Sequence, residues 1–182
     1  MEADLSWLDK AFGVAYRGQR KDVTGKTIIF PETYENNKDD RYVLFPNDKY
    51  KAYSFVDVLD PVEFIYQDEA VKSIYHAFKY NIAIIIYCNL NRIDNTNDLR
   101  SVQANIEQDI INCLARGMDA GKFILKLKTK YNRDISKIFE GYDISKVGEQ
   151  FLAQPYCGFR FECELYLREG CYSANTYIKT KY

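Results

Sequence analysis

The sequence predicts an α+β fold with an antiparallel or mixed sheet and about two main helices packed on one face. Two long strand patterns, at residues 73–89 and 156–168, enclose an amphipathic helical pattern at residues 99–116. The strands do not alternate regularly with helices, as they would in a parallel α/β sheet. The chain has 182 residues and no internal repeat. We therefore expect a single domain over residues 1–170, followed by a C-terminal tail over residues 171–182.

The N-terminal half predicts one helix and several short strands. Residues 2–16 are expected to form an amphipathic helix, because apolar side chains recur there at helical spacing: Leu5, Leu8, Phe12 and Ala15. A polar loop is expected at residues 17–26. Short strands are then predicted at residues 27–30, 41–45, 53–59 and 62–66, with Pro31 and Asp60-Pro61 as breaks.

The C-terminal half holds the strongest patterns. Residues 82–88 are apolar on both faces, which is typical of a central strand. The helix at 99–116 carries an apolar stripe made of Leu99, Val102, Ile106, Ile110, Cys113 and Leu114. Residues 122–131 and 156–168 alternate between apolar and polar side chains, which predicts strands with one face on the core. Between them we expect a short helix near residues 144–152.

Composition excludes several classes of protein. The net charge is −1, whereas tight nucleic-acid binding needs a marked positive surplus. The longest apolar run, from Ile82 to Cys88, is far shorter than the ~20 residues of a membrane span, and we expect no signal peptide. The chain has five cysteines and no CxxC pair, which indicates that the thiols are reduced and that the protein is made in a reducing cytosol. The 16 tyrosines and 11 phenylalanines fit either strand interiors or subunit interfaces.

The chain shows no recognisable catalytic apparatus, so we expect neither enzyme activity nor a cofactor or metal. His76 is the only histidine, and no nucleophile motif surrounds it. The sequence 24–27 resembles the end of a phosphate-binding loop, but Arg20 stands where the first glycine is required. Two acid pairs, Asp39-Asp40 and Glu162 with Glu164, leave a small metal-dependent nuclease as an alternative. On the second pair's strand face, Arg160 and Arg168 can neutralise the acids.

Two groups of basic residues are candidate contacts for a neighbouring subunit or for DNA. One group occupies the predicted loop and contains Arg17, Arg20, Lys21 and Lys26. The other forms a stripe on the polar face of the strand at 122–131 and contains Lys126, Lys128 and Lys130. Either group could touch phosphates or pair with acids of a neighbouring subunit, and a solvated face is the third reading.

Three stretches of the chain carry a family resemblance. They are Ile28-Ile29-Phe30-Pro31-Glu32-Thr33-Tyr34, Tyr53-Ser54-Phe55-Val56-Asp57-Val58 and Tyr80-Asn81-Ile82-Ala83-Ile84-Ile85-Ile86-Tyr87-Cys88-Asn89-Leu90. With the helix and the late strand that follow, they resemble tail-completion or tail-terminator proteins of tailed bacteriophages over most of residues 10–168. The Asn-Leu pair after the long strand is the part most like such chains.

The resemblance implies a tail-terminator-like α+β subunit that assembles into a ring at the phage neck or tail. Its partners would be further copies of itself, other neck and tail proteins, and DNA passing through a central channel without specific binding. It would be located in the virion, made in the host bacterial cytoplasm, and would not contact a membrane. No catalytic residues carry over from this family. A monomeric adaptor that binds one host protein remains a further alternative.

Overall fold

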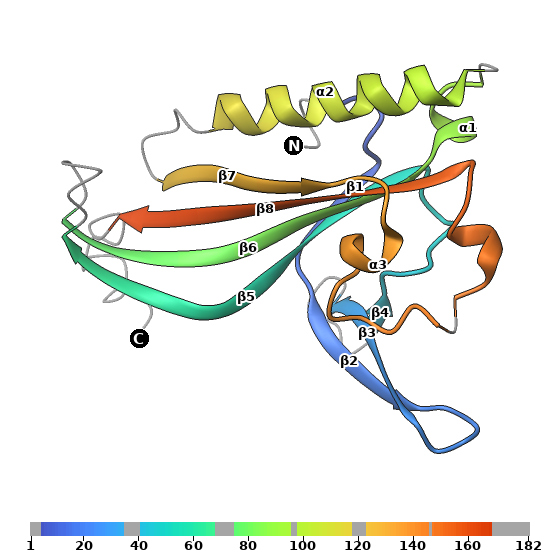
Figure 1. The fold of residues 1–182 in the computed structure, drawn as a ribbon, viewed down its shortest axis with the longest axis horizontal. Coiled ribbons are helices and arrows are strands. Elements are labelled where there is room, and N and C mark those ends of the chain that lie inside the picture. Colours follow the sequence, from blue (N-terminus) through green and yellow to red (C-terminus); the bar gives the residue numbers. More distant parts are fainter. Residues whose placement is uncertain are drawn as a thin grey trace, which may run out of the picture.

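The computed structural model describes residues 5–34, 41–67, 75–95, 98–117, 123–145 and 147–168 (Figure 1). Its main sheet is mixed, with the order β1 (Lys10–Val14), β5 (Ala52–Gln67), β6 (Tyr75–Asn89), β8 (Tyr156–Arg168), β7 (Phe123–Tyr131). A smaller antiparallel sheet contains β2 (Tyr16–Lys21), β3 (Thr27–Tyr34) and β4 (Arg41–Val43). The helices are α1 (Leu90–Ile93), α2 (Leu99–Gly117) and α3 (Ile135–Ile138), with a 3-10 turn η1 (Glu149–Phe151). The predicted α+β class with a mixed sheet is confirmed, but α2 is the one long helix of the described residues, where about two main helices on one face were expected.

Strand β6 is the centre of the main sheet, as its sequence predicts. It pairs antiparallel with β5 on one side and with β8 on the other. Side chains on both of its faces are buried: Ile82, Ile84 and Ile86 on one, Ala83, Ile85 and Tyr87 on the other. A strand that is covered on both faces needs such an unbroken apolar run.

Each face of the main sheet carries its own core. Helix α2 covers one face, and its buried residues are Val102, Ile106, Ile110 and Leu114. The other face is covered at one end by α3, the segment that follows it and the smaller sheet, as Figure 1 shows. The buried side chains of this second core include Leu44, Phe45, Ile138, Phe139 and Tyr142. Among the described residues, no helix covers the rest of the face opposite α2 (Figure 1).

The prediction of an N-terminal helix is wrong for residues 5–16. Leu5, Trp7 and Leu8 pack into the core beneath α2, and Lys10–Val14 forms a strand parallel to β5. Ala15 then packs into the core on the opposite face. The segment crosses from one face of the sheet to the other around the edge of β5. A straight helix on one face could not supply side chains to both cores.

The prediction of a loop at residues 17–26 is wrong for residues 17–21, which belong to β2, and holds for residues 22–26, which form a turn. Residues 16–34 form a β-hairpin, which we call the arm, and it projects away from the main sheet (Figure 1). Hydrogen bonds close its turn: the Asp22 amide donates to the Lys26 carbonyl, and the Gly25 amide to the Asp22 carbonyl. Gly25 has a φ of +82°, a left-handed conformation that favours glycine.

Two prolines that were expected to break strands lie inside them. Pro31 lies within β3, opposite Arg17. Pro61 lies within β5, at a bulge between Leu59 and Glu63 that merges the two predicted short strands into one. The bulge is on a stretch where β5 has no pairing with β1, so the missing proline N–H interrupts no such hydrogen bond.

The remaining differences concern short helices. Instead of a helix over 144–152 there is only the turn η1, while α1 and α3 form where no helix was expected. Asp134 caps α3 by accepting a hydrogen bond from the Ser136 amide at 2.9 Å. Within the described ranges no helix is long and apolar enough to cross a lipid bilayer. The tail expected at residues 171–182 lies outside the described residues.

Candidate subunit-contact surfaces

The basic residues of the predicted loop lie on the arm, and two of them attach it to the body. Arg17 Nη2 lies 3.6 Å from Asp57 Oδ2 on the main sheet. Lys26 Nζ lies 3.5 Å from Asp143 Oδ2, and the Asp143 amide donates to the Ile29 carbonyl at 2.7 Å. The segment after α3 therefore braces the arm along β3, and the arm is a fixed projection.

The other two basic residues of the arm remain exposed. The Arg20 guanidinium stacks over the Phe30 ring, 4.8 Å from its centroid. Lys21 ends β2 at the surface, next to the turn. The structure thus separates the predicted group into Arg17 and Lys26, which form ion pairs within the chain, and Arg20 and Lys21, which can meet a partner.

The arm also displays apolar side chains. Val23 at the tip is fully exposed, in a turn fixed by Asp22, whose Oδ1 accepts from the Thr24 and Lys26 amides. At the base of the arm, Tyr16 and Tyr34 are about half exposed and pack edge to face, with ring centroids 5.4 Å apart. Exposed apolar side chains on an ordered projection are typical of a contact surface.

A second exposed apolar surface lies at the end of the sheet farthest from the arm. We call residues 60–64 of β5 and 78–80 of β6 the sheet end. Val62, Phe64 and Phe78 are each more than 40% exposed, and the two phenylalanine rings pack edge to face at 5.2 Å. Asp60 is exposed beside them. Figure 1 shows the free ends of β5 and β6 at one extreme of the molecule and the arm at the other.

The lysine stripe on β7 is divided between the two faces of the sheet, contrary to the sequence prediction. A bulge between Leu127 and Thr129 shifts the register with β8. Lys128 Nζ lies 3.1 Å from Glu164 Oε1, and Lys126 Nζ lies 4.6 Å from the centroid of the Tyr166 ring. Lys130 instead pairs with Glu107 on α2. Regular alternation predicts that Lys126, Lys128 and Lys130 lie on one face of the sheet. The bulge places Lys130 on the opposite face, next to α2.

Glu162 and Glu164 are both engaged with basic side chains on the face of the sheet opposite α2. Glu164 lies 3.4 Å from Lys79 Nζ, and its Oε2 accepts a hydrogen bond from the Tyr166 hydroxyl at 2.9 Å. Burial acts to raise the pKa of Glu164. Hydrogen bonds from Lys128 and Tyr166 and the charges of the lysines outweigh it, so that the pKa lies below its usual value.

Arg160 on β8 and Asp57 on β5 are buried polar residues on the same face of the sheet. Arg160 is 2% exposed and Asp57 3%. Arg160 Nε donates to Glu162 Oε1 at 3.0 Å. Burial raises the pKa of Asp57 above its usual value, and the charges of Arg17 and Arg160 offset this only in part.

The other candidates for chemistry give no site in the part of the chain that is described. No group of three or more His, Cys, Asp or Glu side chains that could hold a metal occurs there. Asp39 and Asp40 lie outside the described residues, and so does the side chain of His76, whose backbone belongs to β6.

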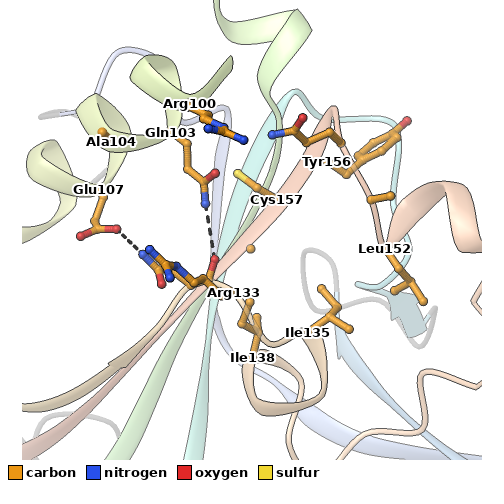
Figure 2. Close-up of a pocket in the computed structure, with 14 residues that line it drawn as sticks. Arg100, Gln103, Ala104, Glu107, Arg133, Ile135, Ile138, Leu152, Tyr156 and Cys157 are labelled. Atoms are coloured by element: carbon orange, nitrogen blue, oxygen red, sulfur yellow. Dashed lines mark hydrogen bonds between the residues drawn. The ribbon is translucent and has the colours of Figure 1, made fainter. Parts of the chain in front are cut away.

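Sequence reasoning missed a cavity of about 640 Å³ at the start of β8, beyond the last residue pair with β7 (Figure 2). Its lining comes from three segments: the first turns of α2, the corner between β7 and α3, and residues 152–158. Arg100, Arg133, Tyr156 and Cys157 are among its lining residues. No spacing in the sequence joins these segments, so only the folded chain reveals it.

No protein-family model matches the chain, and no curated protein sequence is significantly similar to it.

Proposed function

We propose that this protein is a structural, ring-forming subunit of a bacteriophage neck or tail, acting in head–tail joining or tail completion around a channel for DNA. The observation that carries the proposal is that the exposed Val23 of the arm tip and the exposed apolar side chains of the sheet end lie at opposite extremes of the molecule (Figure 1). A second copy of the chain is the partner that would cover both.

Two different surfaces at opposite ends favour a head-to-tail contact. Such heterologous contacts generate a closed ring when the rotation between neighbours closes, whereas identical patches generate a two-fold dimer. The arm would bring Val23 to the Phe64–Phe78 pair of the neighbouring copy. Because the arm is already ordered, little conformational entropy would be lost on association.

The charges of the two surfaces are complementary. Arg20 and Lys21 lie beside the arm tip, while the exposed Asp60 lies on the same stretch of β5 as Val62 and Phe64. Opposite charges around an apolar centre steer the encounter of two subunits and fix their orientation.

The open edges of the main sheet do not favour strand addition as the mode of contact. On β5, Pro61 and the bulge interrupt the edge. On β7, the lysines occupy the edge. Both devices discourage pairing with another strand. Side-chain contacts between the arm and the sheet end are therefore the better mode.

The face of the sheet opposite α2 supports the channel part of the proposal. It presents Lys79, Lys126 and Lys128 together with Glu63 and Glu164, and several of these are paired with one another. A face on which two of the three lysines are paired with acids would hold phosphates weakly. DNA could pass such a surface without being retained.

Self-assembly tests the proposal. We expect native mass spectrometry of the purified chain, over a range of concentrations, to give one closed oligomer. Val23→Asp at the arm tip and Phe64→Asp at the sheet end should each yield monomers. Asn105→Asp, which adds the same charge to the exposed side of α2, should assemble normally.

Mixing the two defective variants tests the head-to-tail geometry. Phe64→Asp keeps an intact arm and Val23→Asp keeps an intact sheet end, so one good contact remains and a heterodimer should form. A wild-type chain that stays monomeric at every concentration, alone and with other virion proteins, would contradict the proposal and favour the adaptor alternative.

A further inference from the structure

Two cysteines face each other across neighbouring strands at the base of the cavity. Cys88 on β6 and Cys157 on β8 are direct register partners, and their sulfur atoms lie 3.1 Å apart. Directly opposed residues of antiparallel strands have Cα atoms about 4.5–5.5 Å apart. Disulfides span Cα distances of about 4.4–6.8 Å, so the backbone can accept a bond between these two sulfurs without moving.

The two thiols differ in access. Cys157 is partly exposed and lines the cavity between α2 and the start of β8, where Figure 2 shows its side chain. Cys88 is 1% exposed. The contact with the Cys157 thiol and burial raise the pKa of the Cys88 thiol, so Cys88 stays protonated while Cys157 meets solvent.

The cavity also carries positive charge. Arg100 on α2 and Arg133 after β7 line it together with Cys157. The acid in the same lining, Glu107, is already paired with Lys130. An anionic reagent approaching Cys157 would therefore be attracted by two guanidinium groups.

We propose that Cys88 and Cys157 are an oxidisable pair that forms a disulfide between β6 and β8 by exchange with an anionic low-molecular-weight disulfide entering through this cavity. The Cys157 thiolate attacks one sulfur of the small disulfide, forms a mixed disulfide and releases one thiolate. The Cys88 thiol then loses its proton to water, and its thiolate attacks the Cys157 sulfur and releases the second small thiolate, which takes up a proton from water. Two protein thiols are oxidised, and one small disulfide is reduced to two thiols.

Oxidised glutathione, which carries several carboxylates, is the probe that tests the proposal. The folded, reduced chain with Cys113→Ser and Cys171→Ser is treated at neutral pH, and the intact mass and proteolytic peptides are measured. We expect the loss of two hydrogens and a cross-linked pair of peptides containing Cys88 and Cys157. Cys163, which is 2% exposed, should remain a free thiol. A stable glutathione adduct on Cys157, no reaction at all, or modification of Cys163 would each overturn the proposal.

Single variants in the same background assign the two roles. With Cys88→Ser the reaction should stop at one glutathione on Cys157, because the second thiol is missing. With Cys157→Ser, Cys88 should stay unmodified, because it is buried. Ready modification of Cys88 in the Cys157→Ser variant would reverse the proposed order.

Comparing an anionic with a neutral disulfide tests whether Arg100 and Arg133 attract the reagent by their charge. Replacing Arg100 and Arg133 by Gln should slow the reaction with oxidised glutathione about two- to fivefold, as loss of local charge attraction predicts. The rate with a neutral disulfide, hydroxyethyl disulfide, should stay unchanged. An equal change with both reagents would show that the arginines do not steer the anion.

Discussion

The guanidinium of Arg17 lies 3.6 Å from the carboxylate of Asp57, and this contact joins the base of the arm to the main sheet. The two partners are in different surroundings, since the Arg17 side chain is half exposed and that of Asp57 is almost wholly buried. Asp57 also lies near the buried Arg160, and the charge of Arg160 acts to lower the pKa of Asp57 against the larger effect of burial. The arm is therefore anchored on a buried carboxylate whose ionisation depends on two cations from different elements.

The pKa of Asp57 is raised overall, and the direction of this shift determines how Asp57 changes the free energy of unfolding with pH. A carboxyl group with a higher pKa in the folded than in the unfolded state stabilises the fold at low pH, and this contribution is lost as pH rises through the folded pKa. We expect the free energy of unfolding of the wild type, relative to Asp57→Asn, to fall as pH rises above about 4, the ordinary pKa of an aspartate, and through the raised pKa of Asp57.

Denaturant titrations at several pH values measure this difference. In an Arg17→Gln background the fall should be larger, because one of the opposing charges is gone and the pKa of Asp57 rises further. A difference that grows with pH would mean that the arginines, and not burial, dominate at Asp57.

Glu164 should behave in the opposite way, because its pKa is lowered. Its contribution to stability is present above the unfolded pKa and is lost as pH falls through the folded value. Glu164→Gln should cost about 1 kcal/mol at neutral pH, since the side chain is mostly buried and has several partners. The loss of unfolding free energy caused by Glu164→Gln should become smaller at acidic pH, because Glu164 is then protonated in the wild type as well.

Glu140→Gln is the matched control for Glu164→Gln. Glu140 pairs with Lys137 at 3.5 Å, but both side chains are about half exposed. Its replacement should cost less than about 0.5 kcal/mol. Equal losses in urea unfolding would show that the network around Glu164 is no stronger than an ordinary surface pair.

Gly18 on the arm should not tolerate a side chain. A Cβ atom there would lie 2.6 Å from Glu32 Cδ and 2.8 Å from Phe30 Cε2, and the Glu32 carboxyl group is buried. Gly18→Ala should lower the free energy of unfolding by about 1–3 kcal/mol, the range for overpacking. Gly148→Ala, whose Cβ would meet its nearest neighbour at an ordinary 3.6 Å, should be close to neutral. Similar midpoints for both variants in thermal unfolding would contradict the packing at Gly18.

The sequence predicted those elements in which one hydrophobic period, strand or helix, continues along the whole element. In β6, β8 and α2 a single period runs from end to end, and each element was predicted at nearly the observed bounds. Residues 5–15 have helical spacing, but their side chains enter two different cores, so tertiary pairing with β5 decides their conformation. A weak local preference gives way to such packing.

The candidate surfaces were predicted only in part, for a similar reason. The basic residues were identified, but the bulge that separates Lys130 from Lys128 depends on pairing with β8, which spacing alone does not encode. The partners of Arg17 and Lys26, Asp57 and Asp143, are distant in sequence. The cavity at Cys157 likewise depends on contacts between distant segments.

Trp7 provides a direct test of the corrected N-terminal segment. It is the only tryptophan, it is 8% exposed in the core beneath α2, and its Nε1 donates to Asp109 Oδ2 at 3.1 Å. We expect blue-shifted emission that acrylamide quenches poorly in the folded chain. Asp109→Leu removes the acceptor and should cost about 1 kcal/mol, whereas Asp109→Asn keeps an acceptor and should cost less. If instead Trp7 emits as in water and both variants match the wild type in urea unfolding, the N-terminal segment does not pack against α2.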